Sequence, residues 1–225
     1  MSGTRRAFKI VGIALVAVLL VFGAAAVWYV SLRPAPLFAS LPAVTTATRS
    51  HPGDPVNIAF VGSKDAVTKA FLAAHWLVPD PIDASSTARI VEASVADAPY
   101  PAAPVSNLYL FGRTQDMAFE LPTNTAQDRH HVRLWQSGDT VSGQPLWIGT
   151  ASYDSGIELS DVNYLPTHHI SPNVDAERGF VSRSLEGTGL VQSSSLERNA
   201  RPTIWSVNGA GDWYFDDGLV RVVRL

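Results

Sequence analysis

The sequence predicts an α+β protein: a single N-terminal transmembrane helix, then one domain with a largely antiparallel sheet and two main helices. A long uncharged apolar run lies near the N-terminus, and two later segments have apolar residues at helical spacing. Strand-like segments outnumber these helices and follow one another directly along the chain, which favours antiparallel pairing. The 225 residues allow one folded domain with appendages, at roughly 100–200 residues per domain.

Composition excludes several classes of protein. The chain has 17 Lys and Arg against 20 Asp and Glu, and no cysteine. Disulfides, thiol nucleophiles, Cys-ligated zinc and iron–sulfur clusters are therefore excluded. The net charge of −3 argues against nucleic acid as a partner, because proteins that bind it are generally basic.

The apolar run extends from Ile10 to Val30, which is 21 residues without a charge. A membrane-spanning helix needs about 20 such residues. Three basic residues precede the run within residues 1–9, whereas Arg33 alone follows it closely. Because basic residues flank the cytoplasmic side of membrane helices, we expect residues 1–9 to be a cytoplasmic tail. The rest of the chain is then extracytoplasmic, in a single-pass protein of the cell membrane.

The alternative is a signal peptide cleaved at Ala24–Ala26. The apolar core of such peptides is about 7–15 residues long, whereas this run continues past the candidate cleavage site. We therefore favour a retained anchor, through which Ile10–Val30 binds the chain to the membrane.

Residues 31–54 contain four prolines and a stretch rich in Thr, Ala and Ser. This composition is typical of an extended linker. We therefore expect a Pro-rich tether over residues 31–54 and the folded domain over residues 55–225.

The first half of the domain is predicted to open with a strand, Val56–Val61, and a helix capped by Ser63. The apolar face of that helix is formed by Val67, Ala70, Phe71, Ala74 and Leu77 or Val78. Five prolines between residues 79 and 104 predict mostly loop. The next predicted strands are Leu108–Phe111, Met117–Leu121, His131–Trp135 and Leu146–Tyr153, the last two as a hairpin around the polar loop Gln136–Gln144.

The second half contains the other main helix, Pro172–Leu185, with Ser171 as N-cap and Gly187 as terminator. A C-terminal hairpin is predicted from Trp213–Phe215 and Leu219–Leu225 around Asp217-Gly218. Four tryptophans are expected in the core, with a glycan- or lipid-contacting patch as the alternative; they are Trp135, Trp147, Trp205 and Trp213.

Common catalytic motifs are absent. Gly62-Ser63-Lys64 lies at a strand-to-helix junction, where phosphate can bind, but the dinucleotide and P-loop glycine patterns are missing. We interpret it as an ordinary turn. The Gly-x-Ser-x-Gly and His-Glu-x-x-His motifs are missing too, which removes the commonest serine hydrolases and zinc proteases but not hydrolases in general.

Polar residues gather around two adjacent histidine pairs, His130-His131 and His168-His169. Neighbours in a strand point to opposite faces, so at most one histidine of each pair reaches any one site. Imidazole and carboxylate suit a divalent metal such as zinc, manganese or iron, and the predicted metal ligands are His131, Asp154, His168 and Asp175. The predicted ligand-binding residues, for a phosphate-like or carboxylate group, are Arg113, Asp116, Arg129, Arg133 and Arg178.

The same residues have a structural interpretation, which we favour. Arg113 would pair with Asp116, and Arg178 with Asp175 one helical turn away, as a polar network that fixes strand register. A binding module predicts that the arginines and histidines are mutually paired and buried. An enzyme predicts that they converge on an open pocket with perturbed pKa values.

Several segments resemble the LssY C-terminal-domain family. They are Tyr100–Ser106 (YPAAPVS), Leu110–Phe119 (LFGRTQDMAF), Arg129–Trp135 (RHHVRLW), Thr167-His168 and Asp175–Arg178 (DAER). The resemblance covers roughly residues 55–190 and favours His168 over His169 as the functional histidine. It implies a bacterial domain of unassigned activity, similar to domains joined to multi-spanning DedA-like or lipid-phosphatase segments. This chain departs from that arrangement in having a single anchor.

Together these observations predict a membrane-anchored bacterial cell-envelope accessory or ligand-binding domain, with other envelope membrane proteins as possible partners. The alternative is a metal-assisted hydrolase acting on phosphorylated or lipid-linked envelope substrates. Whether the chain is an enzyme stays open at this point.

Overall fold

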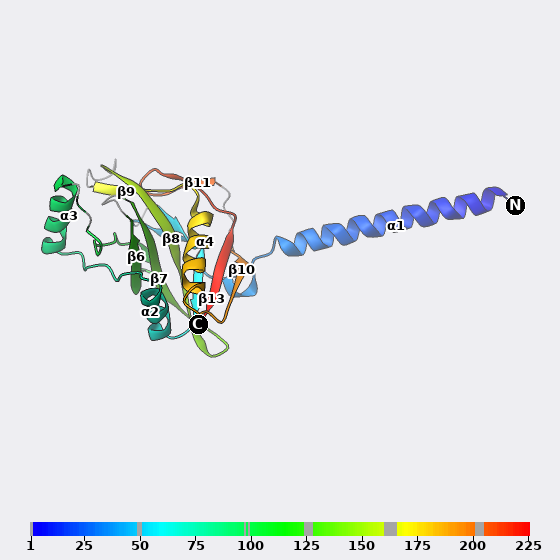
Figure 1. Cartoon of the computed structure of the whole chain (residues 1–225). Helices are drawn as coiled ribbons and strands as arrows, with labels where there is room; N and C mark the ends of the chain where they lie inside the picture. Colours follow the sequence, from blue (N-terminus) through cyan, green and yellow to red (C-terminus); the bar gives the residue numbers. More distant parts are fainter. Residues whose placement is uncertain are drawn as a thin grey trace. The chain divides into compact units, whose positions relative to one another are not determined.

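A computed structural model describes residues 2–48, 51–96, 98, 100–123, 128–159, 166–200 and 205–225. The chain divides into two compact units, Met1–Pro34 and Ala35–Leu225. Figure 1 shows the helices and strands of each unit.

The first unit is the helix α1, Ser2–Ser31. Its segment Gly12–Ser31 has a mean hydropathy of 2.6, and none of its most apolar stretch is buried. By length and composition this helix is able to cross a bilayer, which requires about 20 apolar residues. A signal sequence near the N-terminus has the same length and composition.

The second unit is built on a mostly antiparallel sheet with the strand order β10-β13-β3-β8-β7-β6, and β9 pairs with β8. The strands are β3 (Ile58–Val61), β6 (Met117–Pro122), β7 (Asp128–Val141), β8 (Gln144–Leu159), β9 (Pro166–Ile170), β10 (Ser193–Arg198) and β13 (Leu219–Arg224). Within this described sheet, β13 and β3 pair in parallel and the other pairs are antiparallel. The predicted fold class, α+β with a largely antiparallel sheet, is confirmed.

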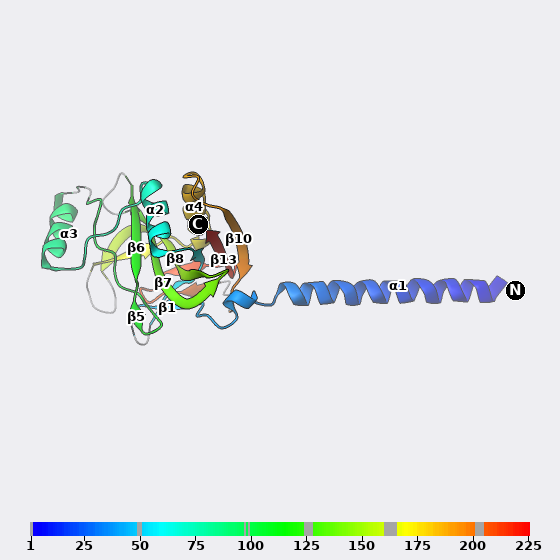
Figure 2. The same ribbon diagram turned by 90° about the horizontal axis from the view of Figure 1, so that it is seen from below.

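One face of the sheet is covered by α2 (Lys64–Ala73) and α4 (Val174–Glu186), as Figure 2 shows. Its core joins Phe71 of α2, Leu185 of α4, and Phe119 and Val132 of the sheet. The rings of Phe71 and Phe119 stack with their centroids 4.1 Å apart. Each such side chain, fully buried, contributes roughly 1.5–3 kcal/mol of hydrophobic stabilisation.

The opposite face is covered by a smaller sheet of order β2-β1-β4-β5. Its strands are β1 (Val44–Thr46), β2 (Pro52–Pro55), β4 (Tyr109–Leu110) and β5 (Arg113–Thr114). Phe38, which ends the short 3₁₀ helix η1 (Pro36–Phe38), packs there with Trp135 and Ile148. The segment expected to be a tether, residues 31–54, is therefore part of the domain from Ala35 onward.

Local signals for the two main helices are largely confirmed. The Ser63 hydroxyl accepts from the Ala66 N–H at 3.1 Å and caps α2. Gly187 ends α4, but the N-cap of α4 is Asn173 and not Ser171. The Asn173 side chain accepts from the Ala176 N–H at 3.0 Å. The helix therefore begins at Val174, two residues later than predicted.

The β7–β8 hairpin is longer than predicted. The expected polar loop Gln136–Gln144 is mostly strand, and the turn is Ser142-Gly143, both with positive φ. A two-residue turn with positive φ at both positions matches the right-handed twist of the flanking strands. The pairing of β7 with β8 therefore continues through the polar residues up to Val141 and Gln144.

The proline-rich stretch, residues 79–104, contains the helix α3 (Ala84–Ala96), so the predicted loop is wrong there. The helix lies between the prolines and contains none of them. At its start the Asp83 carboxylate accepts from the Ser86 N–H at 2.8 Å, and the Ser86 hydroxyl accepts from the Asp83 N–H at 3.0 Å. This reciprocal cap is the arrangement that begins helices.

The predicted C-terminal hairpin is also wrong. β12 (Trp213–Phe215) pairs with β11 (Trp205–Val207), and β13 pairs with β10 and β3. Burial of Val220, Val222 and Val223 inside the main sheet outweighs the local turn signal. Trp135 and Trp147 are buried as expected, whereas Trp205 and Trp213 are 61% and 64% exposed.

Candidate functional site

A cluster of charged side chains is buried on one face of the central strands. Val132 and Leu134 of β7 pack in the core that contains α2 and α4. Because side chains alternate along a strand, Arg129, His131 and Arg133 lie on the other face, and all three are buried.

His130 confirms this alternation. Its ring stacks on Phe180 of α4 at 4.0 Å, and its Nδ1 lies 2.9 Å from a carboxylate oxygen of Glu177. Only His131 of the pair therefore reaches the buried cluster, in agreement with the prediction of one histidine per site.

Strand register brings acidic residues to the same face. His131 of β7 lies opposite Glu120 of β6 and Ser152 of β8, and Arg129 lies opposite Asp154. Paired residues in antiparallel strands point to the same side, so residues distant in sequence form one continuous charged layer.

His131 lies between two carboxylates. Its Nδ1 is 3.2 Å from an Asp154 oxygen and its Nε2 is 3.8 Å from a Glu120 oxygen. Arg129 contacts the same Glu120 oxygen at 3.3 Å. The other Glu120 oxygen, Oε1, has no hydrogen-bond partner among the described residues.

A second pair extends the layer toward the smaller sheet. Arg133 lies 3.4 Å from a carboxylate oxygen of Asp54, and the Ser152 hydroxyl donates to that oxygen at 3.2 Å. The Arg133 guanidinium also donates to the Ser106 carbonyl at 3.0 Å. The side chains of Arg133 and Asp54 are 6% and 8% exposed, so the pair is shielded from water.

Burial perturbs the acids of this cluster. Desolvation raises the pKa of Glu120 to about 8 and that of Asp154 to about 7, and it raises the pKa of Asp54 as well. The nearby Arg129 and Arg133 charges oppose these rises. Both Glu120 and Asp154 can therefore exchange protons near neutral pH.

A separate acidic cluster surrounds Arg178 at the start of α4. The Arg178 guanidinium donates to Asp175 at 3.1 Å and to Asp217 at 2.7 Å. Ligand atoms of Asp175, Asp216 and Asp217 lie within 4.8 Å of one another, and burial raises the pKa of Asp216 to about 6. Arg178 already supplies a positive charge there, so the geometry is that of an internal ion-pair network.

The predicted metal ligands are therefore distributed over different places. The structure brings His131 and Asp154 together, whereas Asp175 belongs to the Arg178 cluster. His168 lies in β9 opposite Ile157, and its side chain lies outside the described residues. His131 supplies one imidazole and Asp154 one carboxylate, and both kinds of group suit zinc, manganese or iron as ligands.

Arg113 and Asp116 form a half-exposed pair at 2.7 Å. Asp116 also accepts from the Gln136 N–H at 2.7 Å, which joins the pair to β7. Each arginine predicted to bind ligand thus has a carboxylate partner inside the domain.

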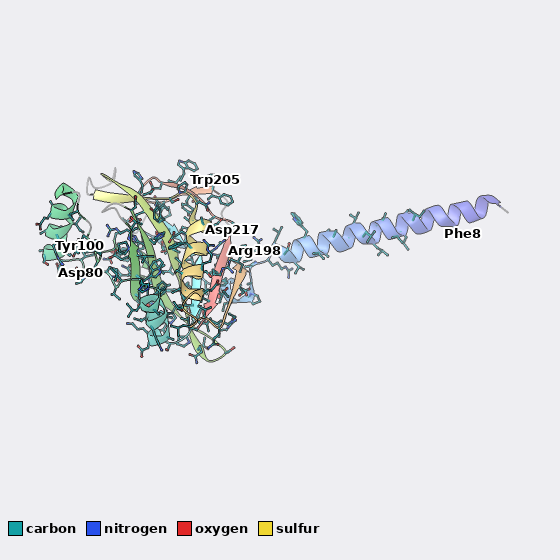
Figure 3. The ribbon with its side chains drawn as sticks, in the orientation of Figure 1. Phe8, Asp80, Tyr100, Arg198, Trp205 and Asp217 are labelled. Carbon is teal, nitrogen blue, oxygen red and sulfur yellow. The ribbon has the colours of Figure 1, made fainter. Side chains whose placement is uncertain are left out.

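Asp116 also lines an open pocket of about 410 Å³ beside the outer strand β6. Four apolar side chains in its lining are Val78, Ile82, Val105 and Met117, and four polar ones are Asp80, Asn107, Gln115 and Asp116. None of the residues described as lining the pocket is basic. Figure 3 marks Asp80, whose carboxylate accepts from the Tyr100 hydroxyl at 2.6 Å.

Sequence reasoning missed Glu120, Asp54 and this pocket. Glu120 has a local signal, because it is the one acidic residue in the apolar stretch Met117–Leu121. Asp54 has none, because it reaches Arg133 only through contact between the two sheets. The Nδ1 of His169, the histidine that the resemblance disfavours, pairs with the Asp212 carboxylate.

The fold and site define an α+β domain with a buried layer of charged residues, and this domain follows an N-terminal apolar helix in the sequence. A family model described as LssY C-terminus matches residues 38–220. The chain belongs to this family, as its sequence segments indicated. No curated protein and no solved structure matched the chain.

Proposed function

We propose that this chain is a membrane-anchored ligand-binding protein of the bacterial cell envelope. In this proposal α1 is a retained anchor, residues 1–9 are cytoplasmic, and the domain from Ala35 onward is extracytoplasmic. The basic flank before the apolar segment supports this orientation. Other envelope membrane proteins are its expected neighbours.

The observation that carries the binding function is the pocket beside β6. Its volume of about 410 Å³ lies in the range of about 300–1,000 Å³ that is usual for small-molecule sites. The arginines, in contrast, are paired inside the domain, with exposures of 7%, 6% and 6% for Arg129, Arg133 and Arg178. Pairing of this kind is what a binding module predicts.

The lining also indicates the class of ligand. Asp80 and Asp116 are the charged groups of the described lining, and each is paired with an arginine, Asp80 with Arg89 at 3.1 Å and Asp116 with Arg113 at 2.7 Å. Paired acids and amide groups beside apolar side chains favour a ligand with an apolar body and neutral hydrogen-bond groups. A phosphate or carboxylate group, which the sequence suggested through its arginines, has no basic partner in this pocket's described lining.

Native mass spectrometry of the full chain, extracted from bacterial membranes in detergent, tests the proposal. We expect a bound small molecule that is lost in Ala118→Phe, because Ala118 lines the pocket and the larger ring would fill it. Ala73→Phe, at an exposed position of α2, is the matched control and should keep the ligand. A parent chain without ligand, or a ligand that Ala118→Phe retains, contradicts the proposal.

A second candidate, a hydrolase of phosphorylated or lipid-linked envelope substrates, is favoured by the group Glu120–His131–Asp154. Carboxyl groups with a pKa of about 8 and about 7 suit general acid–base chemistry near neutral pH. A divalent metal held by His131 and Asp154 would supply a Lewis acid or an activated water. Release of phosphate from lipid phosphates by the full chain, abolished by Glu120→Gln, would favour this candidate over binding alone.

A further inference from the structure

The β11–β12 hairpin has one entirely apolar face. Trp205 pairs with Phe215 and Val207 pairs with Trp213, so these four side chains point to the same side of the hairpin. Trp205 and Trp213 are 61% and 64% exposed, and the rings of Trp205 and Phe215 meet edge to face at 5.6 Å.

The other face of this hairpin is fixed to the domain. Tyr214 is 1% exposed and packs with Ile170 and Val174. The Phe215 N–H donates to the Pro172 carbonyl at 2.7 Å. The hairpin therefore holds its two tryptophans outward on a packed element. Large exposed apolar surfaces of this kind mark sites of contact with a partner or a membrane.

Two backbone hydrogen bonds and a short stretch of chain connect the start of the domain to this apolar face. The Ala35 N–H donates to the Arg198 carbonyl at 3.0 Å, and the next N–H, of Asn199, donates to the Gly218 carbonyl at 2.8 Å. Gly218 is three residues from Phe215, or about 10 Å of chain at most. Figure 3 labels Arg198, Asp217 and Trp205 at this side of the domain.

The chain between the apolar helix and the domain is short. Helix α1 ends at Ser31 and the domain begins at Ala35. The intervening residues span about 14 Å when fully extended. A bilayer that holds α1 is therefore close to the start of the domain, and the hairpin can meet it when the apolar face is turned toward the membrane.

We propose that the apolar face of the β11–β12 hairpin lies in the interface of the bilayer that holds α1, with Trp205 and Trp213 among the lipid headgroups. This inference rests on the membrane anchor of the proposed function. Tryptophan is enriched at this depth, because its ring is amphipathic and its N–H finds polar partners there.

The contact is apolar in character. The acids nearest the hairpin are paired or buried in the domain: Asp217 pairs with Arg178, Asp212 pairs with His169, and Asp216 is 3% exposed and accepts from the Gly218 N–H at 2.8 Å. An attraction to anionic lipid needs clustered basic residues. The proposed occupant is therefore a bilayer surface of zwitterionic lipid, and the contact does not depend on anionic headgroups.

The absence of cysteine allows single-site labelling. The full chain, reconstituted in phosphatidylcholine nanodiscs, is spin-labelled after Trp205→Cys or Trp213→Cys, so that each variant keeps the other tryptophan. Leu72→Cys, at an exposed position of α2, is the control. Collision rates of the label with oxygen, which partitions into lipid, and with a water-soluble nickel chelate then report its depth.

The oxygen-to-nickel ratio is expected to be several-fold higher at positions 205 and 213 than at 72. Trp213→Ser should lower the ratio at 205 toward that at 72. Co-elution of the chain with the discs and water-like ratios at both positions would overturn the hairpin contact and leave the anchor in place. Failure of the chain to co-elute would overturn both. Protection of both positions by a soluble oligosaccharide, and not by the discs, would assign the face to glycan and overturn the lipid contact.

Discussion

Replacement of Arg133 by methionine tests whether the buried charged layer holds the two sheets together. Arg133 and Asp54 are 6% and 8% exposed and lie 3.4 Å apart. The substitution leaves the Asp54 carboxylate buried without its cation, and it removes the hydrogen bonds to Ser106. Breaking a buried pair in this way costs about 3–5 kcal/mol, so we expect the free energy of unfolding at pH 8 to fall by that amount.

The pH dependence of this loss follows from Asp54. Its pKa is already raised by burial, and Arg133 opposes that rise. Without Arg133 the folded-state pKa of Asp54 rises further. The folded domain can then avoid the unpaired charge by keeping Asp54 protonated, which costs less as the pH falls. The loss should therefore be smaller at pH 5 than at pH 8.

Denaturant unfolding of the full chain in detergent, followed by tryptophan fluorescence, measures the effect. The double variant Arg133→Met with Asp54→Asn should recover much of the loss, because both charges are gone. Arg183→Met, at an exposed position of α4, is the control and should cost less than about 1 kcal/mol. A loss below about 1 kcal/mol for Arg133→Met, or no recovery in the double variant, would refute the structural role.

Three further predictions follow from the site and the topology. Burial raises the pKa of Glu120 to about 8, so the folded domain keeps a proton that the unfolded chain loses above about pH 4.3. The free energy of unfolding should therefore decrease from about pH 5 to about pH 8, and Glu120→Gln should flatten that slope in the same denaturation experiment. Mass spectrometry of metal content in the untagged chain should find no stoichiometric transition metal if binding is the function. About one equivalent, lost in His131→Ala together with thermal stability, would favour the hydrolase. A reporter fused after Leu225 should be active outside the cytoplasm, and activity in the cytoplasm would reverse the topology.

The central strands show how far local patterns predict this fold. The alternation of Val132 and Leu134 with Arg129, His131 and Arg133 placed both sets on the correct faces. Glu120 joined the same site only through sheet register with β7. No local pattern contains that register, because it depends on how distant strands align.

Two errors have different physical origins. Prolines between residues 79 and 104 indicated a loop, but they lie outside α3, where they do not remove a helical hydrogen bond. The turn signal at Asp217-Gly218 indicated a local hairpin, but the valines of β13 gain more by burial beside β3. The helix α3 is mostly exposed and begins at the local cap formed by Asp83 and Ser86, whereas longer-range packing decides the pairing of β13.

Photocrosslinking in living cells tests the central claim, that the pocket beside β6 binds a ligand, most directly. A benzophenone amino acid replaces Ile82, a pocket-lining residue that is 55% exposed, or Leu72, a control that is 51% exposed. We predict a discrete small-molecule mass addition at position 82 and not at 72, and its loss when Ala118→Phe is added. No addition at 82, or the same addition at both positions, would contradict the claim.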